Sequence, residues 1–460
     1  MNELKWRQER QASPVIMDTD RLINGHMLFA GMSGTGKSYQ IQNLLNACAR
    51  ENITADVFDV HEELDGSAKS ASAKFSESTR TGFNPLVVSL DPHSGGPRKQ
   101  ISQLIDMVNR TSRQLGPRQE GAIRNLIGDV YYLRGIYPDA PDSWRKDQLT
   151  EHQYDQMIQN RDYTRLKNYY PIIRDVISYA ERKLKTITTG SDTKCVNALE
   201  RVEASAGRIN TLMTRFQKSA SDEEVDQLKT RLEKEKEKAI ESYIDYIRAI
   251  ESGREFQDML KYTNRDTLVS VIERLQSIQN SGIFCSNAPV FGNALIRVYQ
   301  VGALSDDERR LLFFNRAHQI LRECMDAGKS NTLKRIVLVD EGHLYYSEDG
   351  DNPMNRIAKE GRKFGLGIVI GSQSPTHFSE DFLTNCGTVF LMGIHEQYWD
   401  MACRKLKIDQ TTLKATRARE VLSVKMHVLG EASARFQTVN VDQRIVEIGL
   451  NALRGHAQSA

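Results

Sequence analysis

The sequence predicts an α/β fold whose parallel sheet is interrupted by a large helical insertion. A short apolar run at residues 26–30 leads through a glycine-rich loop into a helical pattern, and a second apolar run follows at 54–60. Near-continuous apolar runs return after residue 290, and parallel sheets bury strands of this kind on both faces. Residues from about 100 to 280 are mostly polar with helical spacing. We therefore expect one sheet encoded in two separated pieces.

The composition is that of a folded chain without a dominant charge. Of its 460 residues 39% are hydrophobic, and 62 Lys and Arg face 60 Asp and Glu. A formal net charge of +2 excludes a polybasic arm or an acidic tail as the dominant feature of the chain. Any binding of nucleic acid would therefore use local basic patches. No apolar run reaches about 18 residues and no secretory signal opens the chain. We expect a cytoplasmic protein without membrane insertion.

The six cysteines form neither a CxxC pair nor a metal-ligand spacing, which suits a reducing cytosol.

The insertion contains a predicted antiparallel helical hairpin. Apolar residues recur at steps of three and four through residues 199–216, which is the spacing of a heptad seam. They are Leu199, Val202, Ala206, Ile209, Met213 and Phe216. Ser221 and Glu224 have the spacing of a capping box for a second helix. Its seam residues are Val225, Leu228, Leu232 and Ala239. The alternating charges at 233–238 are expected to form a solvated face.

A phosphate-binding loop follows the first apolar run. Residues 31–38 read Gly-Met-Ser-Gly-Thr-Gly-Lys-Ser, a complete Walker A pattern between a predicted strand and a predicted helix. Backbone N–H groups of such a loop surround phosphate oxygens, Lys37 reaches the β- and γ-phosphates, and the Ser38 hydroxyl ligates Mg²⁺. ATP and Mg²⁺ are therefore the predicted cofactors. The predicted nucleotide-binding residues are Gly31, Ser33, Gly34, Thr35, Gly36, Lys37, Ser38 and Tyr39.

An acidic pair supplies the second half of such a site. The apolar run at 335–339 ends in Asp340 and Glu341. Asp340 would hold the Mg²⁺ shell together with Ser38, and Glu341 would polarise the attacking water.

Three polar residues near the next apolar run complete the catalytic candidates, beside Glu341 and Lys37. Gln373 follows that run, where it would sense the γ-phosphate or serve as an ordinary polar residue at a strand end. Arg356 and Arg362 precede it. Each is either a cation that reaches a nucleotide bound by a neighbouring subunit or a surface charge.

Further fragments occur in a fixed order around these motifs. They are His26, residues 83–86 (Phe-Asn-Pro-Leu), 281–284 (Ser-Gly-Ile-Phe), 340–343 (Asp-Glu-Gly-His), 357–367, 371–375 (Gly-Ser-Gln-Ser-Pro) and Asn385. In this order and spacing they resemble the HerA/FtsK superfamily of DNA-pumping ATPases over roughly half of the chain. The HerA branch and the related conjugation ATPases give the best fit.

The resemblance implies a RecA-like P-loop core that works as a homo-oligomeric ring, usually a hexamer, with ATP sites at subunit interfaces. It also implies translocation of duplex DNA through the ring. Position by position, it gives the roles above to Lys37, Ser38, Asp340, Glu341 and Gln373, and it lets His343 couple hydrolysis to motion. Only about 25 residues precede the Walker A strand, so we expect neither the N-terminal β-barrel of HerA proteins nor the membrane helices of coupling proteins.

The predicted organisation has four segments. Residues 1–99 and 286–400 are the two parts of the RecA-like ATPase core, 100–285 is the helical insertion, and 401–460 is a C-terminal extension. The expected function is an ATP-driven motor that moves duplex DNA, in DNA processing, DNA transfer or anti-phage defence with a nuclease or other effector as partner. Two alternatives remain open. One is an ATP-regulated scaffold that controls an effector through the insertion, and the other is a secretion or packaging ATPase.

Overall fold

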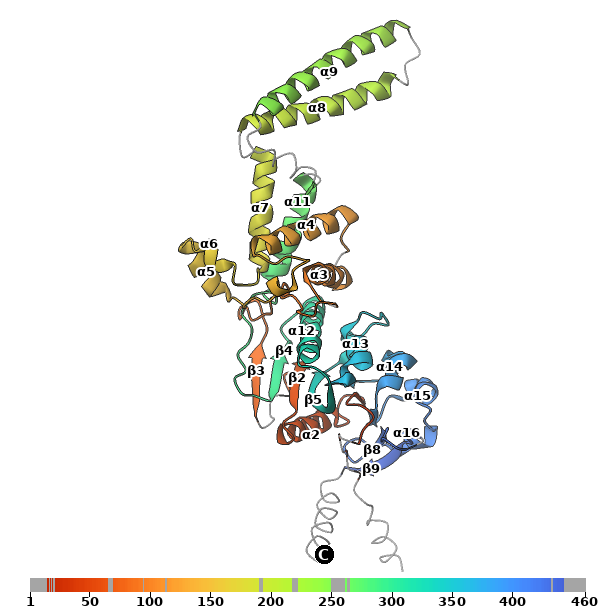
Figure 1. The fold of residues 1–460 in the computed structure, drawn as a ribbon. Coiled ribbons are helices and arrows are strands. Elements are labelled where there is room, and N and C mark those ends of the chain that lie inside the picture. Colours follow the sequence, from red (N-terminus) through yellow and green to blue (C-terminus); the bar gives the residue numbers. More distant parts are fainter. Residues whose placement is uncertain are drawn as a thin grey trace, which may run out of the picture. The chain divides into compact units, whose positions relative to one another are not determined.

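The computed structural model describes residues 15, 17, 19 and 21–441, apart from 65–68, 94, 112–113, 190–192, 217–221, 250–260, 263–264 and 432 (Figure 1). The chain divides into two compact units. The core unit comprises Met1–Asn84 and Ser281–Ala460, and the insertion unit comprises Pro85–Asn280. Residues 85–99, which the sequence patterns grouped with the core, thus belong by their contacts to the insertion unit.

The core unit is built on a sheet that has nine strands among the described residues, in the order β3-β4-β2-β5-β6-β1-β7-β8-β9. The strands are β1 (Met27–Ala30), β2 (Thr54–Asp59), β3 (Ser70–Lys74), β4 (Ile296–Gln300), β5 (Ser330–Val339), β6 (Phe364–Ser372), β7 (Thr388–Leu391), β8 (Val421–Met426) and β9 (Gln437–Asn440). Strands from β3 to β7 run parallel to their neighbours, whereas β8 and β9 pair antiparallel. The parallel part of the sheet agrees with the predicted RecA-like α/β fold, whereas the antiparallel strands β8 and β9 were not predicted.

Three strands differ from the prediction. The apolar runs correspond to β1, β2, β4, β5, β6 and β7, but β3, β8 and β9 had no such signal. β3 consists of small residues and a lysine, Ser-Ala-Ser-Ala-Lys, and is only partly buried. β8 and β9 show that residues after 401, expected as an extension, add two strands to the same sheet.

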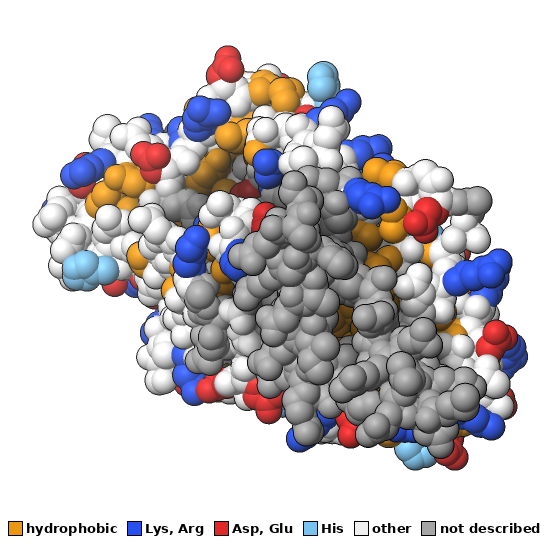
Figure 2. All heavy atoms as spheres, turned by 90° about the horizontal axis from the view of Figure 1, so that it is seen from below, with side chains coloured by type: hydrophobic (Ala, Val, Ile, Leu, Met, Phe, Trp, Pro, Cys, Tyr) orange, Lys and Arg blue, Asp and Glu red, His pale blue; other side chains and the backbone are white. Residues whose placement is uncertain are grey.

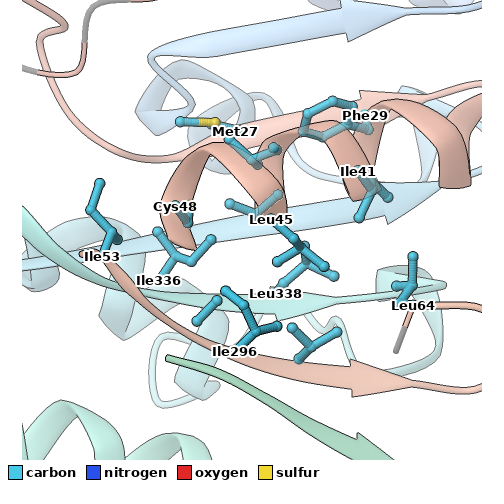
Figure 3. Packing of buried hydrophobic residues seen from close by; sticks show 14 of the residues in the cluster. Met27, Phe29, Ile41, Leu45, Cys48, Ile53, Leu64, Ile296, Ile336 and Leu338 are labelled. Carbon is cyan, nitrogen blue, oxygen red and sulfur yellow. The ribbon is translucent and has the colours of Figure 1, made fainter. Parts of the chain in front are cut away.

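The central strands are buried on both faces, as the apolar runs require. Helix α2 (Lys37–Arg50) lays Ile41, Leu45 and Cys48 against one of these faces. Figure 3 shows these side chains packed against those of β1 and β5, among them Phe29 and Leu338. This packing fixes the start of α2, and hence the glycine-rich loop, at the end of β1.

The other helices of the core unit connect the strands. They are α12 (Asp306–Asp326), α13 (Pro353–Glu360), α14 (Glu380–Asn385), α15 (Trp399–Leu406) and α16 (Gln410–Ala415), with short 3₁₀ turns η2 (Gly342–Leu344), η3 (Gly361–Lys363), η4 (Pro375–His377) and η5 (Glu396–Tyr398). A capping box opens α12: Ser305 Oγ accepts from the Glu308 N–H, and the Ser305 N–H donates to the Glu308 carboxylate at 2.9 Å.

The described regular elements of the insertion unit are all helical. They are α3 (Pro97–Thr111), α4 (Pro117–Leu133), η1 (Pro141–Ser143), α5 (Glu151–Gln159), α6 (Tyr163–Leu166), α7 (Ile173–Thr189), α8 (Thr193–Phe216), α9 (Asp222–Ala249) and α11 (Arg265–Asn280). Helices α4, α7 and α11 pack against one another. Across the described part of both units, no helix combines the length and the apolar character that a membrane crossing needs.

Helices α8 and α9 form the predicted hairpin (Figure 1). Arg208 pairs with Glu235 at 3.0 Å and Arg201 with Asp245 at 4.0 Å, so the two helices run antiparallel. The α9 seam lies inward as predicted, but Ala206, Met213 and Phe216 of α8 are exposed and Ser205 is buried instead. The predicted α8 seam is thus confirmed at Leu199, Val202 and Ile209 and shifted by about one residue at the other positions. Ser221, of the expected capping box, lies outside the described residues.

Candidate nucleotide-binding and catalytic site

The phosphate-binding loop is anchored to the ends of β6 and β7, the two strands that flank β1. The Gly31 N–H donates to Ser372 O at 3.0 Å, at the end of β6, and the Met32 N–H donates to Gly393 O at 2.9 Å, just after β7. Gly34 has φ +79° and Gly36 has φ +99°. These left-handed conformations favour glycine and allow the loop to turn directly into α2. The local sequence thus places Lys37 and Ser38 at a helix N-terminus, where anions bind.

This loop forms one wall of a cavity of about 1060 Å³. Most predicted site residues line this cavity, which brings the Walker A loop, the acidic pair and Gln373 together. They are Ser33, Gly34, Thr35, Gly36, Lys37, Ser38, Tyr39, Asp340, Glu341 and Gln373. Gly31 lies behind the loop, where an added Cβ would stand 2.6 Å from Thr35 Oγ1. Its part is to allow this close approach.

The acidic pair comes to the cavity from the carboxyl end of β5. Asp340 and Glu341 are 6% and 8% exposed, and Glu341 has the left-handed φ of 50°. Lys37 Nζ lies 3.0 Å from Glu341 Oε1. His343 Nδ1 lies 3.2 Å from Glu341 Oε2, although this contact lacks hydrogen-bond geometry and leaves both atoms without such a bond among the described residues. The buried carboxylate thus has one cation directly bonded and two imidazoles nearby, that of His343 and that of His61, whose Nε2 lies 4.0 Å from Oε1.

These contacts set the protonation state of the acidic pair. Burial alone would raise the pKa of Glu341, but contacts with His343 and Lys37 outweigh it and lower the pKa to about 2. Burial raises the pKa of Asp340, and the nearby Lys37 offsets this only in part. Glu341 is therefore a carboxylate at neutral pH, and Asp340 is a buried acid whose anionic form would be favoured by an added cation.

Strand β6 stands between β1 and β5 in the sheet. It therefore delivers Gln373 to the cavity wall between the phosphate loop and the acidic pair. Ser372 Oγ lies 3.1 Å from His377 Nδ1, and the His377 ring lies 4.9 Å from that of His343. A chain of contacts thus connects Glu341 to the loop that carries Gln373.

The two predicted arginines lie away from this cavity. Arg362 is in η3, immediately before β6, and its charge contributes to lowering the pKa of the buried His26, which precedes β1. A nine-residue strand spans roughly 30 Å, so Arg362 stands at the opposite end of β6 from Gln373. Arg356 in α13 lies 3.9 Å from Glu360. Neither arginine lines the cavity of its own subunit.

The structure adds charged residues that the sequence analysis missed, among them Asp59, Arg417 and Arg419. Asp59 ends β2 as a buried carboxylate that accepts from the N–H groups of His61, Glu62 and Leu64, and burial raises its pKa. Its position after an apolar run was a signal available in the sequence. Arg417 and Arg419 line the cavity from the segment before β8. Their distance along the chain from the Walker A loop left no local pattern to indicate them.

The cavity suits a bound divalent cation. No cluster of three His, Cys, Asp or Glu side chains among the described residues forms a metal site by itself. A buried Asp340 and a Ser38 hydroxyl on the same cavity match instead the sparse protein ligation that Mg²⁺ has when phosphates and water complete its shell. Ser38 and Asp340 are thus the residues that would hold it.

Comparison with known proteins assigns the family. The sequence model described as the central domain of the helicase HerA matches residues 6–299, more than half of the chain. The chain belongs to this HerA family. A double-strand break repair helicase HerA of Pyrococcus furiosus is 38% identical over 63 residues, 13% of this chain and 11% of that protein. A probable helicase of Methanocaldococcus jannaschii is 25% identical over 166 residues, 33% of this chain and 32% of that protein.

These alignments span at most about a third of each of those two relatives. A solved structure covers much more of the fold. VirB4 of Thermoanaerobacter pseudethanolicus superposes with a TM-score of 0.55 over 94% of this chain and 93% of that chain, at 14% identity. This likeness shows a shared fold. The HerA family member described here therefore has the P-loop ATPase architecture, as the motifs predicted.

Proposed function

We propose that this HerA family protein is a Mg²⁺-dependent ATPase that works as a homo-oligomeric, hexameric ring and translocates duplex DNA. The observation that carries the proposal is the convergence of Lys37, Asp340, Glu341 and Gln373 on one cavity beside the phosphate loop. The family assignment and the similarity to a DNA double-strand break repair helicase support the choice of DNA. The free thiols of the described cysteines Cys48, Cys285, Cys324, Cys386 and Cys403 support a cytoplasmic setting.

The residues divide the hydrolytic step among them. Lys37 would leave Glu341 and bind the β- and γ-phosphates, since its single ammonium group cannot fully serve both anions. The freed Glu341 carboxylate, ionised at neutral pH, would then orient the attacking water and accept its proton. Gln373 would donate to the γ-phosphate. Mg²⁺ held by Ser38 and Asp340 would neutralise phosphate charge.

The ring supplies the remaining cation. Arg362 and Arg356 do not line the cavity of their own subunit, so we propose that one of them, first Arg362, acts on a nucleotide bound by a neighbouring subunit. On the face shown in Figure 2, lysine and arginine side chains of the described residues are interspersed with acidic ones. DNA contacts are accordingly proposed to use individual cations along the pore.

Steady-state ATPase measurements with and without long duplex DNA, at fixed moderate salt, test this function. We expect several-fold stimulation by duplex, lost in Lys37→Ala and in Glu341→Gln. Lys329→Ala and Glu348→Gln make the same substitutions at exposed positions and should behave as wild type. If ATP hydrolysis did not respond to nucleic acid, the proposed motor function would be contradicted for the isolated protein.

The hairpin favours a second candidate, an ATP-regulated scaffold for an effector such as a nuclease. Helix α9 exposes Ile240, Tyr243, Ile244 and Ile247, which share one face at helical spacing. Contiguous exposed apolar side chains of this kind are typical of a surface that binds another protein. Replacing Ile244 by Asp should leave DNA-stimulated hydrolysis intact in a motor, whereas a scaffold should lose its effector. The ATPase measurement with and without duplex DNA would also separate a DNA motor from a secretion or packaging ATPase, because duplex DNA alone should not stimulate the latter.

A further inference from the structure

A tight turn at residues 417–421 closes against the phosphate loop. The Arg417 N–H donates to Val421 O at 2.9 Å, and the Val421 N–H donates to Arg417 O at 3.0 Å. Arg419 occupies the turn with φ 64°, a left-handed conformation that side chains other than glycine seldom adopt. The turn leads into β8, which begins at Val421 and pairs antiparallel with β7. Residues of this turn line the cavity.

Arg419 bonds the phosphate loop through two groups. Its backbone N–H donates to Thr35 O at 3.1 Å, and its side-chain Nε donates to Gly34 O at 3.0 Å. A phosphate loop must turn its N–H groups inward, so carbonyl groups on its outer side need other donors. Arg419 supplies donors for two successive carbonyls. The arginine and the loop lie 385 positions apart in the sequence.

The exposed Arg419 side chain also lies against a second glycine of the loop. Gly36 lies against the same arginine, since an added Cβ would stand 3.7 Å from Arg419 Cγ. Gly34 is open, with no atom within 4 Å of an added Cβ. Within the loop, the Thr35 hydroxyl donates to Met32 O at 2.8 Å, whereas Arg419 supplies the hydrogen bonds that Gly34 O and Thr35 O accept from the segment before β8.

We propose that Arg419 is a positioning residue that holds the phosphate loop in its binding conformation before nucleoside di- or triphosphate arrives. The proposal rests on the proposed function of the cavity and adds a residue outside the Walker motifs. A loop that is already shaped avoids the cost of ordering when the ligand binds. Loss of the side-chain bond should thus weaken nucleotide binding and leave the chemistry at saturation nearly unchanged.

The test compares Arg419→Gly with Arg161→Gly in the full-length protein. Both arginines have a positive φ, of 64° and 56°, so glycine relieves the backbone in both, but Arg161 lies in the insertion unit. Arg419→Gly keeps the N–H bond to Thr35 and removes only the side chain. We expect the Kd for a fluorescent ADP analogue and the KM for ATP to rise on the order of tenfold, with kcat within about twofold and an unchanged unfolding temperature. Arg419→Lys, with a donor of similar reach, should restore part of the affinity.

Amide hydrogen exchange of residues 33–38 without nucleotide gives an independent readout. Arg419→Gly should accelerate it, and Arg161→Gly should not. Wild-type affinity and wild-type exchange in Arg419→Gly would overturn the proposal. If wild-type protein bound no nucleotide, the proposed function would fail, while the exchange experiment would still decide whether Arg419 holds the loop.

Discussion

Lys37 Nζ lies 3.0 Å from Glu341 Oε1, so the lysine of the phosphate loop is bonded to the carboxylate expected to activate water. Both side chains are 10% exposed. In this arrangement the anion that Lys37 would meet in a nucleotide is replaced by a protein carboxylate, and Glu341 is engaged before substrate is present. Nucleotide binding must therefore exchange one ion pair for another.

The pairing predicts a coupling between the two residues in protein without nucleotide. Lys37→Ala removes the cation nearest a buried carboxylate and should lower the free energy of unfolding by about 3 kcal/mol. Glu341→Gln leaves Lys37 an amide oxygen and should cost less. The double variant should be more stable than the sum of the single effects implies, by about 1 kcal/mol or more. Urea unfolding of the four proteins measures this, and strictly additive effects would contradict the ion pair.

His26 predicts a loss of stability in mild acid. It is fully buried, its Nδ1 accepts the Ile368 N–H at 3.1 Å, and burial, aided by Arg362, lowers its pKa to about 4. The unfolded chain binds a proton here below pH 6.5, whereas the folded chain does not until about pH 4. The stability that neutral His26 contributes is therefore present above pH 6.5 and lost as the pH falls toward 4, by at most about 1.4 kcal/mol per pH unit.

Substitution of His26 by Asn isolates this effect, since Asn keeps an acceptor and does not titrate. Unfolding free energies at pH 7 and pH 5 should differ more in wild type than in His26→Asn. His93→Asn, at an exposed histidine, should retain the wild-type difference. Equal acid sensitivity in wild type and His26→Asn would show that another group is responsible.

The parts of this protein that the sequence predicted are those encoded locally. Apolar runs predicted the buried strands, and residues 31–38 predicted their own loop because glycine and lysine spacing is contiguous. Asp56 illustrates the limit: within the apolar strand β2 it is fully buried, and Arg335 Nε bonds it at 2.6 Å from β5. Such pairings join residues hundreds of positions apart, and no periodicity records them.

The same reason explains the missed cavity wall and the shifted seam. β3 lacks an apolar pattern because it lies at the sheet edge, and Arg419 reaches the loop only after β8 has joined the sheet. In the hairpin, Ser205 lies inward where Ala206 was predicted, because packing against α9 fixes the rotation of α8. Spacing alone leaves that rotation uncertain by one residue.

Arg417 predicts a direct contribution to nucleotide affinity. It lines the cavity, and its guanidinium has no hydrogen-bond or ion-pair partner in the described part of the chain. An arginine so placed should attract the phosphates of a bound nucleotide. Arg417→Ala should weaken binding of ATP by about three- to tenfold and of AMP less, and Arg417→Lys should recover part of the loss. Calorimetric titrations with ATP and AMP distinguish this from a fold defect, which would affect both nucleotides equally.

Arg362 predicts complementation between two inactive subunits. Because it stands at the far end of β6 from Gln373, an Arg362→Ala subunit should bind ADP normally yet hydrolyse ATP at least a hundredfold more slowly when all neighbours carry the same change. Glu341→Gln subunits are inactive through their own cavity. Co-expressed with two affinity tags, the mixed oligomer joins intact cavities to intact arginines at roughly a quarter of its interfaces and should regain measurable hydrolysis. A mixed oligomer as inactive as its parents, with both subunits recovered in it, would show that Arg362 is a surface charge and would direct the same experiment to Arg356.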